Sequence, residues 1–158
     1  MKAPPLIPSV LSFGKINADG ATNVIPDKVE IAGTFRTMDE EWRIKAHEII
    51  EQISHNTAKS MGGNCEVEIR KGYPTIFNNI ELTKHATELT RQFLGDKNIV
   101  TLDPRMTTDD FSYFSQTIPS VFFRLGAGFE KEENYQLHSS KFLANEELLK
   151  FSPGLVAW

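Results

Sequence analysis

The sequence predicts a mixed fold of helices and strands, α+β or α/β in class, built in two successive parts. Residues 29–36 alternate apolar and polar side chains, which is typical of a half-buried strand. Residues 39–61 place apolar side chains on one face of a helix, and residues 65–70 alternate again. A Gly-Tyr-Pro run at 72–74 then interrupts the pattern, so we expect a boundary between parts 1–74 and 75–158.

The first part is expected to follow the order β-β-α-β. Residues 10–16 form the first predicted strand, and the loop before residue 29 contains Pro26, which does not fit a central strand. Thr37 and Glu40 have the spacing of a capping box at the start of the helix, and Gly62-Gly63 supplies its end. The apolar face of this helix is expected to pack on the second strand and comprises Trp42, Ala46, Ile49, Ile50, Ile53 and Thr57.

The second part alternates shorter elements. A helix is expected to start at Asn79 and end at Gly95, and a second, short helix follows Thr107–Asp110. Strands are predicted at 98–102 and 119–125, and a last helix opens at Asn145. The strand at 119–125 looks buried on both faces but has few partner strands, so several elements need more surface than the chain provides.

Composition excludes several classes of protein. The formal net charge of −4 argues against nucleic-acid binding, which needs a basic face. No apolar run is long enough to span a membrane, and the start of the chain lacks the apolar stretch of a secretory signal. The single Cys65 excludes an internal disulfide and a thiolate zinc cluster. We therefore expect a cytoplasmic protein.

His138 is the first candidate for chemistry, because it lies in a polar loop after a predicted strand and a glycine turn. An imidazole there can bind zinc, or it can be an ordinary surface histidine, since a catalytic zinc site needs about three protein ligands. His47, Glu51 and His55 share the helix face opposite the apolar stripe, which favours a solvated face over a metal site.

Other polar residues have both structural and functional interpretations. Arg36 ends a strand and can bind a carboxylate or remain solvated. Asn23 can bind a ligand or serve as a turn residue. Asp109 and Asp110 precede a helix, where negative charge complements the helix dipole without further function.

Several short motifs, taken in order, resemble one family over nearly the whole chain. These motifs are Gly14–Ile16, Gly20–Asp27, Gly33–Arg36, Met106–Ser112, Phe122–Gly126, Leu137–Phe142 and Asn145–Leu148. With them the chain resembles the aminoacylase/hippurate hydrolase family of metal-dependent amidohydrolases. Asp109 stands where the family's Met-x-x-Glu-Asp-Phe motif has a glutamate, one methylene longer.

The resemblance implies a fold and assigns the two parts of the chain to two different domains. Residues 1–74 correspond to part of a ferredoxin-like lid and dimerisation domain, and residues 75–158 to the C-terminal part of a zinc-peptidase-like α/β catalytic domain. The family's general-base glutamate and its other metal ligands belong to an N-terminal stretch without counterpart here. The resemblance therefore implies a fragment of an amidohydrolase that cleaves N-acyl amino acids or similar small amides, acting as a homodimer.

Site residues follow from matching positions. His138 corresponds to the family's last metal ligand, for a divalent cation such as zinc. Asn23 and Arg36 correspond to lid positions that face the substrate, and Gly126 to a point where backbone approaches it. No catalytic residue is expected in this chain. The alternative is a lid and dimerisation module with no enzymatic activity of its own.

Overall fold

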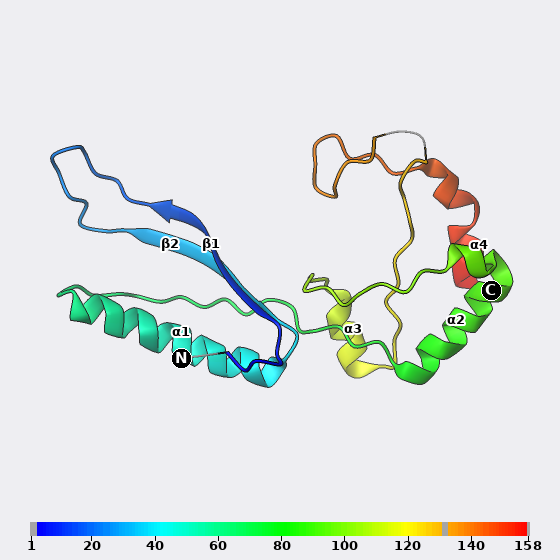
Figure 1. Ribbon diagram of the computed structural model, residues 1–158, viewed down its shortest axis with the longest axis horizontal. Helices are drawn as coiled ribbons and strands as arrows, with labels where there is room; N and C mark the ends of the chain where they lie inside the picture. Colours follow the sequence, from blue (N-terminus) through cyan, green and yellow to red (C-terminus); the bar gives the residue numbers. More distant parts are fainter. Residues whose placement is uncertain (1–2, 131–132, 158) are drawn as a thin grey trace. The chain divides into compact units, whose positions relative to one another are not determined.

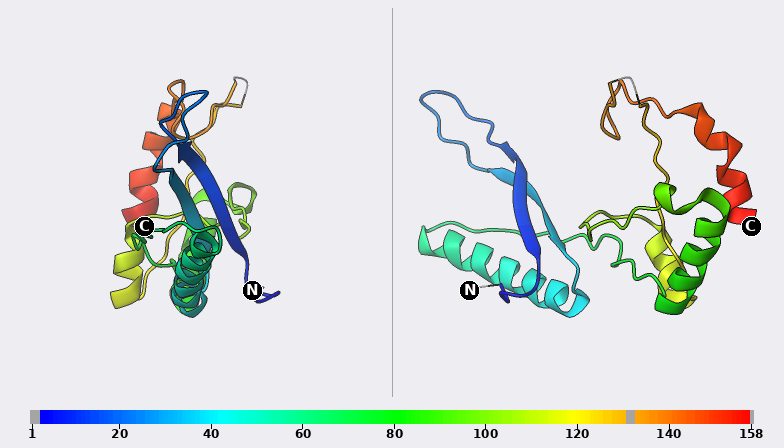
Figure 2. Two further views of the ribbon diagram at one scale, coloured as in Figure 1. Left: turned by 90° about the vertical axis from the view of Figure 1, so that its left-hand side faces the viewer. Right: turned by 45° about the vertical axis from the view of Figure 1, so that its right-hand side comes forward.

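The computed structural model describes residues 3–130 and 133–157, and it divides into two compact units (Figures 1 and 2). Unit 1 comprises the chain up to Thr75 together with Pro104–Asp109, and unit 2 comprises Ile76–Asp103 and the chain from Asp110 onward. The chain therefore passes between the units three times. Five residues lie outside the described part of the chain: Met1, Lys2, Lys131, Glu132 and Trp158. Of these, Lys131 and Glu132 belong to the predicted polar loop around His138.

Unit 1 is built on an antiparallel hairpin of β1 (Ser9–Asn17) and β2 (Glu30–Thr37). Leu11 lies opposite Phe35, and Ile16 lies opposite Ile31. The pairing register shifts between Phe13 and Lys15, where one extra residue is inserted into β1. Without that bulge Ile16 would point to the other face, so the irregularity keeps the apolar side chains together on one face of the hairpin.

The helix α1 (Glu40–Ser60) packs on that apolar face near the end of β2. Trp42 and Ala46 are 8% and 3% exposed, and they are the buried apolar residues of the part of the chain that the structure describes. The indole nitrogen of Trp42 donates to the hydroxyl of Ser9 on β1 at 2.8 Å. The core of unit 1 is therefore small and lies at the start of the helix.

The predicted packing is wrong for the far half of this helix. Ile53 is 50% exposed, and its expected partners Val29 and Ile31 are 51% and 59% exposed. Figure 1 shows the reason, because the hairpin and α1 meet near the N-terminus of the helix and diverge from there. The apolar stripe is present in the sequence, but only its first turns reach the sheet.

The start of α1 differs from the predicted capping box. The N-cap is Asp39, whose carboxylate accepts a hydrogen bond from the backbone N–H of Trp42 at 2.7 Å. Thr37 lies too early to cap, since the helix begins at Glu40, and Glu40 is engaged elsewhere. The predicted end is confirmed, because Gly62 has a left-handed φ of 80° just after the helix.

The third strand of the predicted β-β-α-β order is not formed. Residues 64–71 have no ladder hydrogen bonds and are not assigned as a strand. Their side chains nevertheless alternate as expected, with Cys65, Val67 and Ile69 half-buried between exposed neighbours. The pattern controls which side chains are covered, but a strand also requires a neighbouring backbone to pair with.

Unit 2 contains two α-helices longer than six residues, α2 (Ile80–Leu94) and α3 (Phe111–Thr117), within its described residues. Short elements complete it: η1 (Asp96–Asn98), η2 (Glu146–Lys150) and α4 (Ser152–Ala157). Asn79 caps α2 by accepting from the Leu82 N–H at 2.9 Å, and Gly95 ends the helix, as the sequence predicts. The single last helix expected from Asn145 is instead divided into η2 and α4.

The two strands predicted in unit 2 are not formed either. Residues 99–102 and 119–125 are irregular, and Phe123 is 52% exposed. One side chain substitutes for a partner strand: the amide of Asn78 donates to the Phe122 carbonyl at 3.0 Å and accepts from the Phe122 N–H at 2.8 Å. The Asn79 N–H adds a bond to the Ser120 carbonyl at 2.9 Å. A full strand would need a longer neighbouring backbone.

Within the described residues, none of the helices combines the length and the apolar character needed to cross a bilayer.

Candidate functional site

His138 lies on an exposed turn of unit 2 with an unusual backbone. Its φ is 69°, the one positive φ among the described residues other than glycine. The turn is closed by hydrogen bonds from the Ser139 N–H to the Gln136 carbonyl at 3.1 Å and from the Phe142 N–H to the Ser139 carbonyl at 3.0 Å. A left-handed conformation of this kind is uncommon for a residue with a side chain, and such conformations cluster at functional sites.

The surroundings of His138 do not complete a metal centre. Across residues 3–130 and 133–157, no group of three or more His, Cys, Asp and Glu side chains is arranged to hold a metal ion. A catalytic zinc site needs about three protein ligands, so the residues present do not fit a zinc ion by themselves. His138 can supply one imidazole ligand at most.

Asn23 occupies a tight turn in the loop between the two strands. Ala21 and Val24 pair through two backbone hydrogen bonds of 3.2 and 3.1 Å, which places Asn23 inside the turn. Gly20 is required next to it, because an added Cβ would come within 2.8 Å of the Val24 carbonyl oxygen. The position therefore has a structural role, and the exposed amide of Asn23 is still available to a ligand.

Arg36 makes a specific contact within unit 1. Its guanidinium donates to the backbone carbonyl of Met106 at 2.8 Å. Met106 opens the Met-Thr-Thr-Asp-Asp-Phe motif, so Arg36 ties this motif to the end of β2. A guanidinium has five N–H donors, which leaves donors for a carboxylate as well.

Gly126 lies in an exposed part of unit 2. A Cβ added there would meet no atom within 4 Å, so nothing in the structure itself requires glycine at this position. The next residue is fixed more firmly, since the Ala127 carbonyl accepts from the Asn145 N–H at 2.9 Å. A requirement for glycine at 126 would have to come from a bound molecule.

The structure does not bring Asn23 and Arg36 together. Arg36 lies six residues beyond the start of β2, about 20 Å along the strand at about 3.3 Å per residue. Asn23 lies in the loop before that start. Two substrate contacts from one copy of the hairpin would therefore have to reach a long ligand, or they would belong to different sites.

The predicted solvated face of α1 is only partly solvated. His55 is exposed and lies 3.8 Å from Glu51, as expected of a surface pair. His47 is half-buried and packs edge-on against the Phe35 ring, with ring centroids 6.1 Å apart. Burial, together with the positive charges of Arg43 and Lys71, lowers the pKa of His47. His47 is therefore a packing residue.

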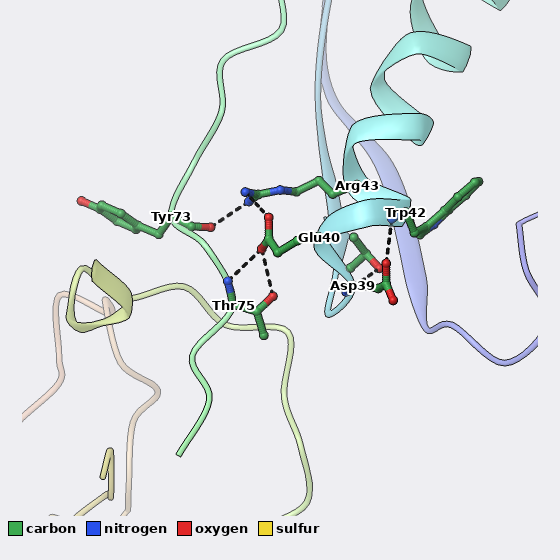
Figure 3. Close-up of polar contacts among 7 residues, drawn as sticks. Asp39, Glu40, Trp42, Arg43, Tyr73 and Thr75 are labelled. Carbon is green, nitrogen blue, oxygen red and sulfur yellow. Dashed lines mark hydrogen bonds and ion pairs between the residues drawn. The ribbon is translucent and has the colours of Figure 1, made fainter. Parts of the chain in front are cut away.

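A polar cluster at the start of α1 was missed by the sequence analysis (Figure 3). The Glu40 carboxylate accepts from both the backbone N–H and the hydroxyl of Thr75, at 2.9 and 3.1 Å. Arg43 pairs with Glu40 and donates to the Tyr73 carbonyl at 2.9 Å. An i, i+3 Glu-Arg pair is common on helix surfaces, so no local signal marks the distant backbone it binds.

Comparison with known proteins gives the family. A family model described as "Peptidase family M20/M25/M40" matches residues 8–151. A Synechocystis protein named "Probable hydrolase" is 35% identical over 90% of this chain and 37% of its own length. An N-acetyldiaminopimelate deacetylase of Streptococcus thermophilus is 32% identical over 94% of this chain and 38% of its own length.

A solved structure supports the same assignment. It is described as a "putative aminohydrolase" from methicillin-resistant Staphylococcus aureus, and it superposes with a TM-score of 0.76 at 28% identity. The superposition covers 98% of this chain and 40% of the other, so the chain spans well under half the length of the proteins it matches. Peptidases of this family are in general metal-dependent hydrolases that act on small amide substrates. This chain belongs to peptidase family M20/M25/M40.

Proposed function

We propose that the chain is the C-terminal portion of a metal-dependent amidohydrolase that cleaves N-acyl amino acids or similar small amides. The observation that carries the proposal is the family match over residues 8–151, with each motif from Gly20–Asp27 to Leu137–Phe142 present in order. A relative named as a deacetylase of an N-acetylated amino acid supports this choice of substrate class.

Each unit would contribute residues to metal or substrate binding. In unit 2, His138 supplies one imidazole ligand to a divalent metal ion, which we propose is zinc. The residue has a left-handed backbone conformation and lies on an exposed turn. Gly126 leaves room for a substrate to approach the backbone. In unit 1, Asn23 and the remaining donors of Arg36 bind the amide or carboxylate groups of the substrate. The other metal ligands and a general base would come from residues outside this chain.

The proposal includes a homodimer formed through unit 1 and a cytoplasmic location. The β1–β2 hairpin has two strands, so each strand has one edge without a ladder partner. Its apolar face also exposes Phe13 and Ile16, at 62% and 69%. Pairing with a second copy would cover both features.

A second function, a lid and dimerisation module without activity of its own, is favoured by the exposed apolar residues of the hairpin, such as Phe13 and Ile16. A second copy of the module would cover these residues. The two functions can be distinguished at His138, which is needed for metal binding and turnover in the enzyme and has no role in the dimerisation module.

The test is substitution of His138 in a chain that also carries the N-terminal portion its relatives have. We expect His138→Ala to lower both bound metal and turnover of N-acetyl amino acids by at least about tenfold, since a lost ligand weakens metal binding. His85→Ala, an exposed histidine on α2, is the matched control and should change neither quantity. Unchanged metal content in His138→Ala would refute the assignment and leave the dimerisation module as the better account.

A further inference from the structure

The chain leaves and re-enters unit 1 through two short segments, and both are held by charged side chains. The first is 73–75, after which the chain continues as unit 2, and the second is 104–109, which returns to unit 1 and leaves it again. The side chains that hold them are Arg36, Glu40 and Arg43. All three come from the end of β2 and the first turn of α1, which we call the 36–43 corner.

The grip on residues 73–75 is made on both sides of Pro74. Glu40 accepts from the N–H and the hydroxyl of Thr75, at 2.9 and 3.1 Å, and Arg43 donates to the Tyr73 carbonyl at 2.9 Å (Figure 3). Proline fixes its own φ and has no N–H, so these bonds engage the backbone groups on either side of a rigid residue. The segment is thereby fixed in both position and direction.

The two bonds that Glu40 accepts from Thr75 are partly buried, whereas the bond from Arg43 to the Tyr73 carbonyl is exposed. The Arg43 and Glu40 side chains are 19% and 35% exposed, whereas other ion pairs of the chain, such as Lys28–Glu30, are 79% and 59% exposed. Hydrogen bonds to an ionised group are stronger than neutral ones, and partial exclusion of water weakens the competition from solvent. Glu40 and Arg43 also orient each other through their ion pair.

The second segment is held independently. Arg36 donates to the Met106 carbonyl at 2.8 Å from the other side of the corner, at the end of β2. The bond from Arg36 to Met106 shares no residue with the bonds that Glu40 and Arg43 make to Thr75 and Tyr73.

We propose that the 36–43 corner is a positioning device that makes both segments, 73–75 and 104–109, part of unit 1. The Met-Thr-Thr-Asp-Asp-Phe motif then begins from a fixed point within unit 1. This inference does not depend on the proposed enzymatic function.

Amide hydrogen exchange of the 158-residue chain tests the device. Glu40→Ala should accelerate exchange of the Thr75 N–H by about tenfold or more, the factor that corresponds to losing one charge-assisted hydrogen bond. Arg36→Ala removes a donor to the Met106 carbonyl and should shift the NMR resonance of that carbonyl carbon, whereas Glu41→Ala should not.

Glu41→Ala is the matched control, because Glu41 is exposed and lies in the same acidic first turn of α1. It removes an equal charge near the helix N-terminus and should leave both segments unchanged. Glu40→Gln keeps an acceptor and should have a smaller effect at Thr75 than Glu40→Ala. The proposal is overturned if Thr75 exchanges equally in Glu40→Ala and the parent, or if exchange rises equally throughout α1, because Glu40 would then stabilise only the helix.

Discussion

Strand β2 and the segment 65–70 have the same alternating pattern but different structures. Side chains of β2 alternate across a hairpin, and its backbone pairs with β1 from Ser9 to Asn17. In β2 only Phe35 and Thr37 are half-buried, although the strand is formed. The 65–70 segment covers every second side chain, yet its backbone has no ladder partner. Alternating burial and strand formation are therefore separate properties, because a strand forms only where a second backbone segment lies beside it.

In unit 2, residues 119–125 likewise have the sequence pattern of a strand without forming one. The apolar run Val121–Phe123 predicts a buried strand, but the available partner is the side chain of Asn78, which satisfies the N–H and the carbonyl of one residue, Phe122. A carboxamide presents one donor and one acceptor in the geometry of a peptide group, so it can replace a single residue of a strand. Longer pairing needs backbone from another element.

The largest effect is expected for Trp42→Ala, which should destabilise unit 1 by about 3–5 kcal/mol because a large buried side chain is removed. Trp42 is buried against the hairpin and donates to Ser9 of β1, so the loss should fall on the β1–β2 hairpin. Denaturant unfolding gives the free energy, and hydrogen exchange should show protection lost in β2 but little change in 65–70. An equal loss of exchange protection in β2 and in 65–70 would contradict the difference that we describe between these two segments.

Asn78→Ala should have the next largest effect, about 1–3 kcal/mol in unit 2, because the Phe122 N–H and carbonyl lose their partners. Chemical denaturation of unit 2 measures it. Asn98→Ala, which removes a single bond from an exposed amide to the Leu94 carbonyl, is the control and should cost less. If the two variants are equally stable, Asn78 does not substitute for a strand.

Ile53→Ala should cost about 1 kcal/mol, roughly half the effect of a fully buried aliphatic side chain, because Ile53 is 50% exposed. Unfolding at low protein concentration measures this value. A cost of about 2–5 kcal/mol that appears only at high concentration would mean that a second copy covers the far half of α1. That outcome would show that the apolar side chains of the far half of α1 are buried by a second copy of the chain.

The smallest effect is a pH dependence at His47. Burial against Phe35, followed by the charges of Arg43 and Lys71, lowers its pKa in the folded chain from the ordinary value of 6.5. The unfolded chain therefore binds the proton more readily, and the stability contribution is complete above pH 6.5 and is lost as pH falls. His47→Asn should reduce the slope of unfolding free energy against pH below that value. Equal slopes in the parent and the variant would contradict the burial of His47.

Local signals account for what could be predicted. The caps and ends of helices depend on a few adjacent residues, so Asn79, Gly62 and Gly95 were identified from the sequence. Three predicted strands failed because strand pairing depends on distant backbone. The bulge of β1 was also missed, since a one-residue insertion leaves no mark in an apolar pattern already broken by Gly14 and Lys15.

The candidate site divides in the same way. The motif positions of His138 and Arg36 were visible in the sequence, and the unusual backbone of His138 became visible only in the structure. The contact of Arg36 with Met106 joins residues 70 positions apart, and the grip of Glu40 on Thr75 joins residues 35 apart. No short pattern encodes contacts of that range.

The most direct measurement is hydrolysis of N-acetyl amino acids by the purified 158-residue chain, with and without added zinc, manganese or cobalt. A two-metal or one-metal centre requires several converging ligands, and His138 supplies only one. We therefore predict negligible turnover under all these conditions, together with weak zinc binding that His138→Ala removes. Robust turnover that a chelator abolishes would contradict the account, because it would require a complete metal site within this chain.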